Sequence, residues 1–105
     1  MAVWRAASPP DAEGASLVLR LARGEGAALG AFFDRYAGLA YGLALRILRD
    51  RTEAEDVVQE VFVQVWRQAA RYEPARGTPA AWVCAIARTR ALDQLRRRVA
   101  RREEP

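Results

Sequence analysis

The sequence predicts an all-α fold, a compact bundle of about four helices. Apolar residues recur at three- and four-residue intervals in successive segments, and this spacing places them on one face of an α-helix. Glycine, proline and helix-capping residues separate the segments. Neither an internal repeat nor the alternation of a half-buried strand is present. The length of 105 residues suits one domain with a modest core.

The first two helices are predicted over residues 11–23 and 27–49. Residues 1–10 end in a Ser-Pro-Pro sequence, and we expect them to form a flexible tail. The first helix places on one face Leu17, Val18 and Leu21. Two glycines then end it. The second helix carries a longer apolar stripe of Leu29, Phe32, Phe33, Tyr36, Ala40, Leu43 and Ile47.

A capping box predicts the start of the third helix. In the sequence TEAE, the Thr52 hydroxyl and the Glu55 carboxylate can each accept a hydrogen bond from a backbone N–H at a helix start. We expect the helix to run to about Tyr72, because Pro74 stops it. Its apolar stripe consists of Val57, Val58, Val61, Phe62, Val65 and Ala69.

A threonine cap and a proline predict the start of the fourth helix. Thr78 is the expected N-cap and Pro79 lies in the first turn, where proline is favoured; the helix should reach about Arg102. One apolar stripe should pack on the other helices, and it consists of Val83, Ala87, Ala91, Leu95 and Val99.

Composition excludes several classes of function. All 17 basic residues are arginine, against 13 acidic residues, and the net charge is +4. Histidine is absent, which excludes the usual zinc sites and the Ser–His–Asp and Cys–His nucleophiles. Cys84 is the single cysteine, so no internal disulfide can form, and we read it as a small core residue in a reducing compartment. No apolar run is long enough to span a bilayer, and no signal peptide is recognisable. We expect a cytoplasmic protein without metal or cofactor.

Charge is unevenly distributed between the last two helices. Residues 50–60 hold five acids and one arginine, whereas residues 76–102 hold eight arginines and one acid. On the third helix, one face carries Glu53, Asp56, Glu60 and Gln64. Acids in a first turn are stabilised by the helix dipole, but Glu60 lies beyond that turn. The strip therefore suits a basic protein partner better than an enzyme site, since a helix face offers no substrate pocket.

A second face of the fourth helix has the composition of a nucleic-acid surface. It carries Trp82, Ile86, Thr89, Arg90, Asp93 and Arg97. Arginines neutralise phosphates, and an indole stacks on an exposed base. Two other interpretations stay open at this point. A tryptophan in the first turn of an amphipathic helix is more often a core residue, and arginines near a helix C-terminus can be a solvated end that favours the dipole.

Three separated strings resemble the extracytoplasmic-function (ECF) sigma factors of the bacterial sigma-70 family. They are FFDRYAGLAYGLALRILRD at 32–50, AEDVVQEVFVQVW at 54–66 and RYEPARGTPAAWVCAIARTRALDQLRRR at 71–98. The strings occur in the family's order and spacing, and the resemblance covers nearly the whole chain. It implies that residues 11–105 form a region 2 domain, which takes part in transcription initiation and is not an enzyme.

The resemblance also implies roles for individual residues. Docking on the clamp helices of the RNA polymerase β′ subunit falls to Asp56, Gln59 and Glu60, with Glu55 and Val63 at the margin. Capture of a flipped base of the promoter −10 element falls to the segment that contains Arg71, Tyr72, Arg76 and Thr78. Trp82 matches the aromatic residue at the edge between duplex and bubble. Contacts to the upstream edge of the −10 element fall to Ile86, Thr89, Arg90, Asp93 and Arg97.

Two departures from the family pattern bear on this assignment. Many ECF sigma factors carry asparagine where this sequence has Thr89, and the shorter hydroxyl side chain would change the hydrogen bonding near the −10 element. The family's second domain, a helix-turn-helix that reads the −35 element, is absent before Pro105. We therefore expect an excised N-terminal domain.

Two other classes of function fit the same residues. One is a sigma-like interaction module that an anti-sigma factor sequesters, in which case the basic helix faces an acidic protein. The other is a generic basic helical DNA-binding domain without polymerase contact.

Overall fold

The computed structural model describes residues 11–103, and this part of the chain is helical without any strand. Four α-helices form it: α2 (Ala12–Ala22), α3 (Ala27–Leu48), α4 (Arg51–Gln68) and α5 (Pro79–Glu103). Two 3₁₀ turns, η1 (Ala69–Arg71) and η2 (Pro74–Arg76), connect α4 to α5. The predicted all-α bundle is therefore confirmed, while the tail expected at residues 1–10 lies outside the described residues.

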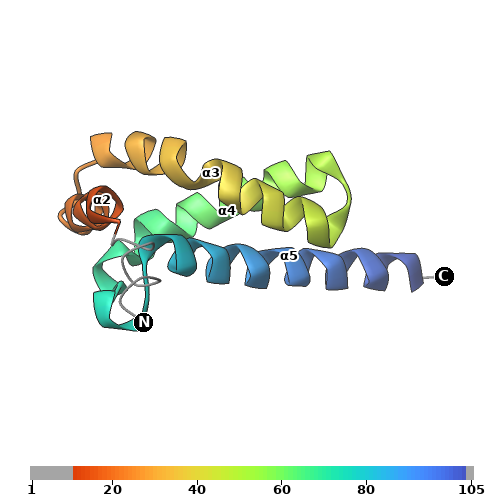
Figure 1. Cartoon of the computed structure of the whole chain (residues 1–105). Helices are drawn as coiled ribbons and strands as arrows, with labels where there is room; N and C mark the ends of the chain where they lie inside the picture. The colour runs from red at the N-terminus through yellow and green to blue at the C-terminus, as the bar shows by residue number, and fades with distance from the viewer. Residues whose placement is uncertain (1–10, 104–105) are drawn as a thin grey trace, which may run out of the picture.

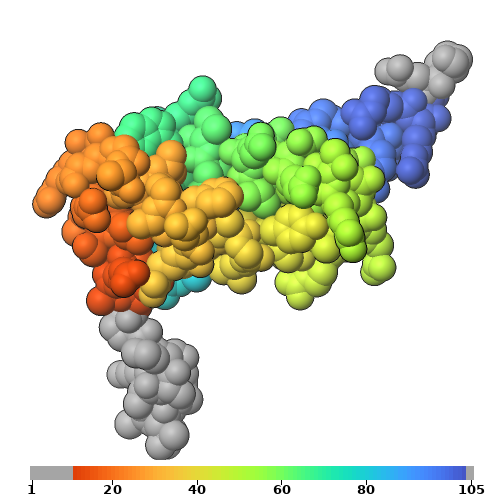
Figure 2. Space-filling model, turned by 90° about the horizontal axis from the view of Figure 1, so that it is seen from above, coloured from red at the N-terminus to blue at the C-terminus, as the bar shows by residue number. Residues whose placement is uncertain are grey.

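The helices α3, α4 and α5 lie side by side and enclose the core, and α2 crosses one end of them (Figure 1). The two 3₁₀ turns lie at the same end as α2 (Figure 1). α5 is the longest helix, and its last turns project beyond the turn between α3 and α4 (Figures 1 and 2). The protein therefore has one end built of loops and α2, and one end from which a basic helix projects.

The apolar stripes of α2 and α4 are buried as the sequence predicts. On α3 the buried positions instead follow a four-residue period, through Ala28, Phe32, Tyr36, Ala40, Ala44 and Leu48. Three of these six buried residues are alanines. Phe33, which the stripe included, is 40% exposed, and it packs against Phe62 in a T-shaped pair with 5.0 Å between ring centroids.

A polar cluster fixes α2 on α3. Asp11 caps α2 by accepting a hydrogen bond from the Gly14 N–H, and it also accepts hydrogen bonds from the Arg35 guanidinium and the Tyr36 hydroxyl. These two donors hold the pKa of Asp11 well below its usual range. Burial, followed by the contact with Asp11, raises the pKa of Tyr36 to about 12. A Cβ atom on Gly14 would overlap the Tyr36 hydroxyl, so only glycine fits there.

The start and end of α4 differ from the sequence prediction. Asp50, not Thr52, is the N-cap, and its carboxylate accepts a hydrogen bond of 2.8 Å from the Glu53 N–H. The helix begins earlier because Arg49 adopts a left-handed conformation that ends α3 and turns the chain at once. The α-helical part ends at Gln68 rather than at Tyr72, well before Pro74.

The start of α5 is confirmed, but its apolar stripe is buried only in part. Thr78 caps the helix by accepting a hydrogen bond of 3.1 Å from the Ala81 N–H. Val83, Ala87 and Ala91 are buried and Leu95 is partly buried. Val99 is 46% exposed. The prediction that Val99 packs on the other helices is therefore wrong.

Candidate functional site

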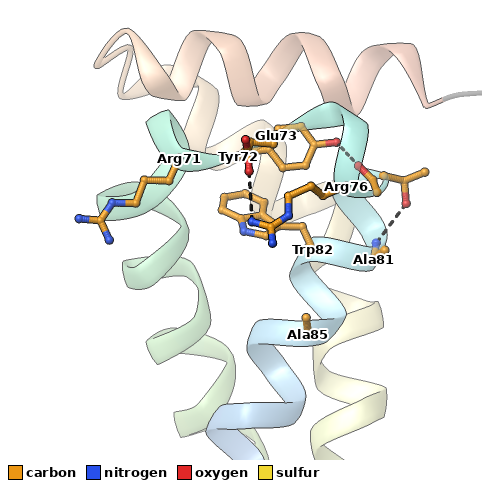
Figure 3. Close-up of a pocket in the computed structure, with 9 residues that line it drawn as sticks. Arg71, Tyr72, Glu73, Arg76, Ala81, Trp82 and Ala85 are labelled. Carbon is orange, nitrogen blue, oxygen red and sulfur yellow. Dashed lines mark hydrogen bonds and ion pairs between the residues drawn. The ribbon is translucent and has the colours of Figure 1, made fainter.

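A pocket lies at the loop end of the bundle, between η1, η2 and the first turns of α5 (Figure 3). Its volume is about 280 Å³. This loop pocket is lined by Arg71, Tyr72, Glu73, Arg76, Gly77, Thr78, Ala81, Trp82 and Ala85. The structure thus brings together five residues that the sequence assigned separately to base capture and to the edge of the bubble, namely Arg71, Tyr72, Arg76, Thr78 and Trp82.

Trp82 combines the two alternatives that the sequence left open. Its ring contacts Phe32 of the core edge to face, with 6.3 Å between centroids. It also packs on Tyr72, at 5.2 Å, and lines the loop pocket. The indole is therefore partly buried and serves the core, while its remaining surface is available inside the pocket.

A tyrosine and a glycine hold the loop of the pocket in shape. The Tyr72 hydroxyl donates a hydrogen bond of 2.6 Å to the Gly77 carbonyl oxygen, which closes the loop across η2 (Figure 3). Burial raises the pKa of Tyr72 above its ordinary value. Gly77 has a φ of 149°, a conformation that L-residues with a side chain rarely adopt. The hydrogen bond and the glycine together define the conformation of the loop.

The arginines of the loop pocket differ in their orientation. The Arg76 side chain extends across the indole in Figure 3, and its guanidinium forms an ion pair of 3.1 Å with Glu73. Arg71 points away from the ring, outward from η1 (Figure 3). Both side chains are exposed, so both can reach a phosphate group near the mouth of the pocket.

Farther along α5, the residues predicted to meet DNA divide into two groups. Thr89 and Arg97 are exposed, and Asp93 is partly exposed and pairs with Arg96 at 2.7 Å. Ile86 is only 6% exposed and packs in the core, which corrects its placement on the same exposed face. The stripes of α5 drift around the helix, so this isoleucine faces inward although its neighbours in the predicted set do not.

The acidic face of α4, defined by Glu55, Asp56, Gln59, Glu60 and Val63, lies at the surface. Glu60 is partly exposed and the other four side chains are exposed. Glu53 does not belong to this face. Its carboxylate turns to α5 and binds the Arg98 guanidinium at 2.7 Å, while Arg98 also donates a hydrogen bond to the Leu48 carbonyl oxygen. The acidic strip predicted from the sequence is therefore divided: Asp56 and Glu60 lie at the surface, whereas Glu53 packs against α5.

Two aromatic residues, one on α4 and one on α3, are exposed although the sequence did not predict it. Trp66 is 40% exposed and lies three residues after Val63, on the same side of α4. Phe33 of α3 is also 40% exposed, and its ring contacts Phe62 of α4. The i, i+3 spacing in α4 was a signal for Trp66, whereas the exposure of Phe33 depends on how α3 packs. Trp66 adds apolar area to the side of α4 that carries the acidic face.

Four residues of the acidic face and Arg90 of α5 line a cleft between α4 and α5, with a volume of about 490 Å³. Glu60 and Arg90 face each other across it at 3.8 Å. Arg90 also donates a hydrogen bond of 2.8 Å from Nε to the Gln64 side-chain oxygen. The Oε1 atom of Glu60 is shielded from solvent and accepts no hydrogen bond from any described residue.

Residues 11–103 contain no cluster of three or more side chains that could hold a metal ion. No helix in the described part of the chain is long and apolar enough to cross a bilayer. Cys84 is a partly buried free thiol.

Residues 32–101 match the model of the sigma-70 region 2 family. The chain is 40% identical over 81 residues to the ECF RNA polymerase sigma factor SigK of Mycobacterium ulcerans, an alignment that covers 77% of this chain and 43% of the relative. It is 38% identical over 81 residues to SigK of Mycolicibacterium vanbaalenii, covering 77% of this chain and 41% of that protein. The chain thus spans about two fifths of the length of these curated relatives.

The helical bundle, the acidic face and the loop pocket lie within or beside the matched residues. These features define a region 2 domain of the type that bacterial transcription initiation factors carry. Sigma factors are not enzymes. The chain belongs to the sigma-70 region 2 family, and the relatives above are ECF sigma factors.

Proposed function

We propose that the chain is the promoter-recognition domain of an alternative RNA polymerase sigma factor. It docks on the β′ clamp helices through α4 and holds unpaired −10 promoter DNA at the loop pocket and along α5. It acts where the polymerase acts, in the cytoplasm. The observation that carries the proposal is the arrangement of a carboxylate surface and an indole-lined pocket on neighbouring helices of one small domain.

The composition of the α4 surface supports docking on a protein. Asp56 and Gln59 are exposed acceptors near the centre of the acidic face, and Trp66 adds a large aromatic ring beside them. Protein interfaces combine such an aromatic anchor with charges that select a partner of opposite sign. A basic helical partner fits this surface, and the family resemblance favours the clamp helices as that partner.

The shape and chemistry of the loop pocket support capture of a single base. Its volume of about 280 Å³ is at the small end of ligand sites, which suits a base better than a larger ligand. Trp82 offers a π-surface on which a base can stack, and Arg71 and Arg76 lie close enough to neutralise the flanking phosphates. Melting DNA costs about 1.4 kcal/mol per base-pair step, and stacking of a captured base offsets part of that cost.

Binding to a purified fragment that contains the β′ clamp helices tests the docking half of the proposal. Reversing the charge of Asp56 with Asp56→Arg should weaken binding by about tenfold or more, as for a central interface residue. Glu103→Arg makes the same charge change at the far end of α5 and should leave affinity within about twofold. Equal affinity of both variants and the parent chain would contradict docking through α4.

A further inference from the structure

Arg90 lies at the point where the two proposed surfaces meet. It belongs to α5, whose arginines are proposed to grip DNA, yet its guanidinium faces Glu60 of the acidic face at 3.8 Å. Both side chains are 39% exposed, so each is accessible to a partner as well as to the other. A cation this close to a carboxylate presents less positive charge to an approaching phosphate.

Gln64, rather than Glu60, holds Arg90 in place. The Arg90 Nε atom donates to the Gln64 side-chain oxygen at 2.8 Å, and the Gln64 amide donates in turn to Gln68 at 3.2 Å. The contact with Glu60 is too long for a hydrogen bond. Arg90 therefore keeps its position without Glu60, and the main effect of Glu60 on Arg90 is to neutralise part of its charge.

Glu60 itself retains an unused acceptor. Its Oε1 atom, the oxygen that lies 3.8 Å from the Arg90 guanidinium, is shielded from solvent and accepts no hydrogen bond from residues 11–103, although the side chain as a whole is 39% exposed. A carboxylate oxygen without a donor is unfavourable, so a charged donor that reaches the exposed part of the Glu60 carboxylate can replace Arg90 as its neighbour. The cleft beside it has a volume of about 490 Å³ and is lined also by Asp56, Arg67 and Gln94. An arginine or lysine side chain of a docking partner fits this space on the side where Asp56 and Glu60 lie.

We propose that Glu60 masks the charge of Arg90 in the unbound domain, and that a cationic side chain of the docking partner takes over Glu60 and frees Arg90 for a DNA phosphate. This inference rests on the proposed function, because it requires both surfaces. The coupling is reciprocal: DNA that engages Arg90 releases Glu60 and strengthens docking by the same factor. Glu60 thus makes DNA affinity depend on the polymerase.

Removing the mask tests the inference in the absence of polymerase. In Glu60→Gln, the affinity of the chain for a single-stranded −10 oligonucleotide at 50 mM salt should rise about two- to fivefold, the range for a half-exposed ion pair. The slope of log affinity against log salt should steepen by about 0.7, the value for one added phosphate contact on a single strand. A change in packing alone would not alter this slope.

Two further variants isolate the pair. Glu103→Gln makes the same change in net charge at the end of α5 and should alter affinity less than Glu60→Gln does. In an Arg90→Gln background, Glu60→Gln should give no gain, because no masked cation is left. No gain in the single variant, or the same gain in both backgrounds, would overturn the proposal. Failure of the proposed function would be seen in separate measurements. The parent chain would not bind the clamp fragment, or Trp82→Ala would leave its affinity for DNA unchanged.

Discussion

Trp82 carries the most direct prediction, because its ring has both a core side and a pocket side. Truncating a fully buried tryptophan to alanine costs about 3–5 kcal/mol. The Trp82 ring is only partly buried, so Trp82→Ala should lower the free energy of unfolding by roughly half of that, about 2 kcal/mol. The ring also offers a stacking surface to a base, which is worth about 1–3 kcal/mol. Affinity for unpaired −10 DNA should therefore fall about 5- to 150-fold.

The two effects can be separated with a second aromatic residue. Tyr41 is also partly buried against the core, on α3, and does not line the loop pocket. Tyr41→Ala should lower stability by a similar amount, about 2 kcal/mol, and leave DNA affinity within about twofold. Trp82→Phe should keep part of the stacking and recover part of the affinity. Urea unfolding monitored by circular dichroism measures the first quantity, and fluorescence anisotropy of a labelled strand at low temperature measures the second.

The result that would refute this reasoning is an equal loss of DNA affinity in Trp82→Ala and Tyr41→Ala. It would mean that both act through stability and that the pocket side of the indole binds nothing.

Two further predictions concern the packing that positions the surfaces. Gly14→Ala should destabilise the domain by about 1–3 kcal/mol, since the added Cβ atom overlaps a tyrosine hydroxyl of α3. Gly30→Ala should stabilise the domain by about 0.5–1 kcal/mol, because the space around Gly30 is open. Urea unfolding midpoints of the two variants that move in the same direction would contradict this packing. Glu53→Gln should destabilise at pH 7, and the gap to the parent chain should close in acid. The Arg98 guanidinium holds the pKa of Glu53 below its ordinary value of 4.5. Because the pKa of Glu53 is lower in the folded protein, the ion pair stabilises the fold at pH values above the ordinary pKa. This stabilisation is lost as the pH falls through the pKa of the folded protein. A difference in unfolding free energy between Glu53→Gln and the parent chain that stays constant from pH 7 to pH 3 would show that the pair contributes nothing.

Hydrophobic periodicity was sufficient to predict the helices and most of the core. Val57, Val61 and Val65 recur every four residues and are all buried, because an apolar face on a helix is removed from water only by packing against other helices. The sequence also predicted the start of α5 correctly, because Thr78 and Pro79 determine it through local contacts.

The errors arose where two local solutions compete or where packing between helices decides. Asp50 and Thr52 can both cap a helix, and the left-handed turn at Arg49 selects Asp50. Glu53 and Glu60 lie on one face of α4 by sequence, but the position of Arg98 on α5 draws Glu53 away from the surface. The contacts between α4 and α5 depend on the rotation of each helix about its axis, which the sequence of either helix does not contain.

For the candidate site, the sequence was informative about residue types and not about their neighbours. It placed Trp82 and Arg76 in separate elements, and the structure unites them in one pocket through the loop that Tyr72 closes. It assigned Glu60 and Arg90 to different partners, and the structure places them against each other.

The measurement that tests the central claim most directly is promoter opening by the chain together with core RNA polymerase. The chain is added to core enzyme and a promoter fragment, and permanganate reactivity reports unpaired thymines on the −10 non-template strand. We predict reactive thymines with the parent chain, and their loss in Trp82→Ala although that variant still binds the polymerase. A polymerase-bound parent chain that leaves the −10 thymines unreactive, or reactivity unchanged by Trp82→Ala, would contradict the account.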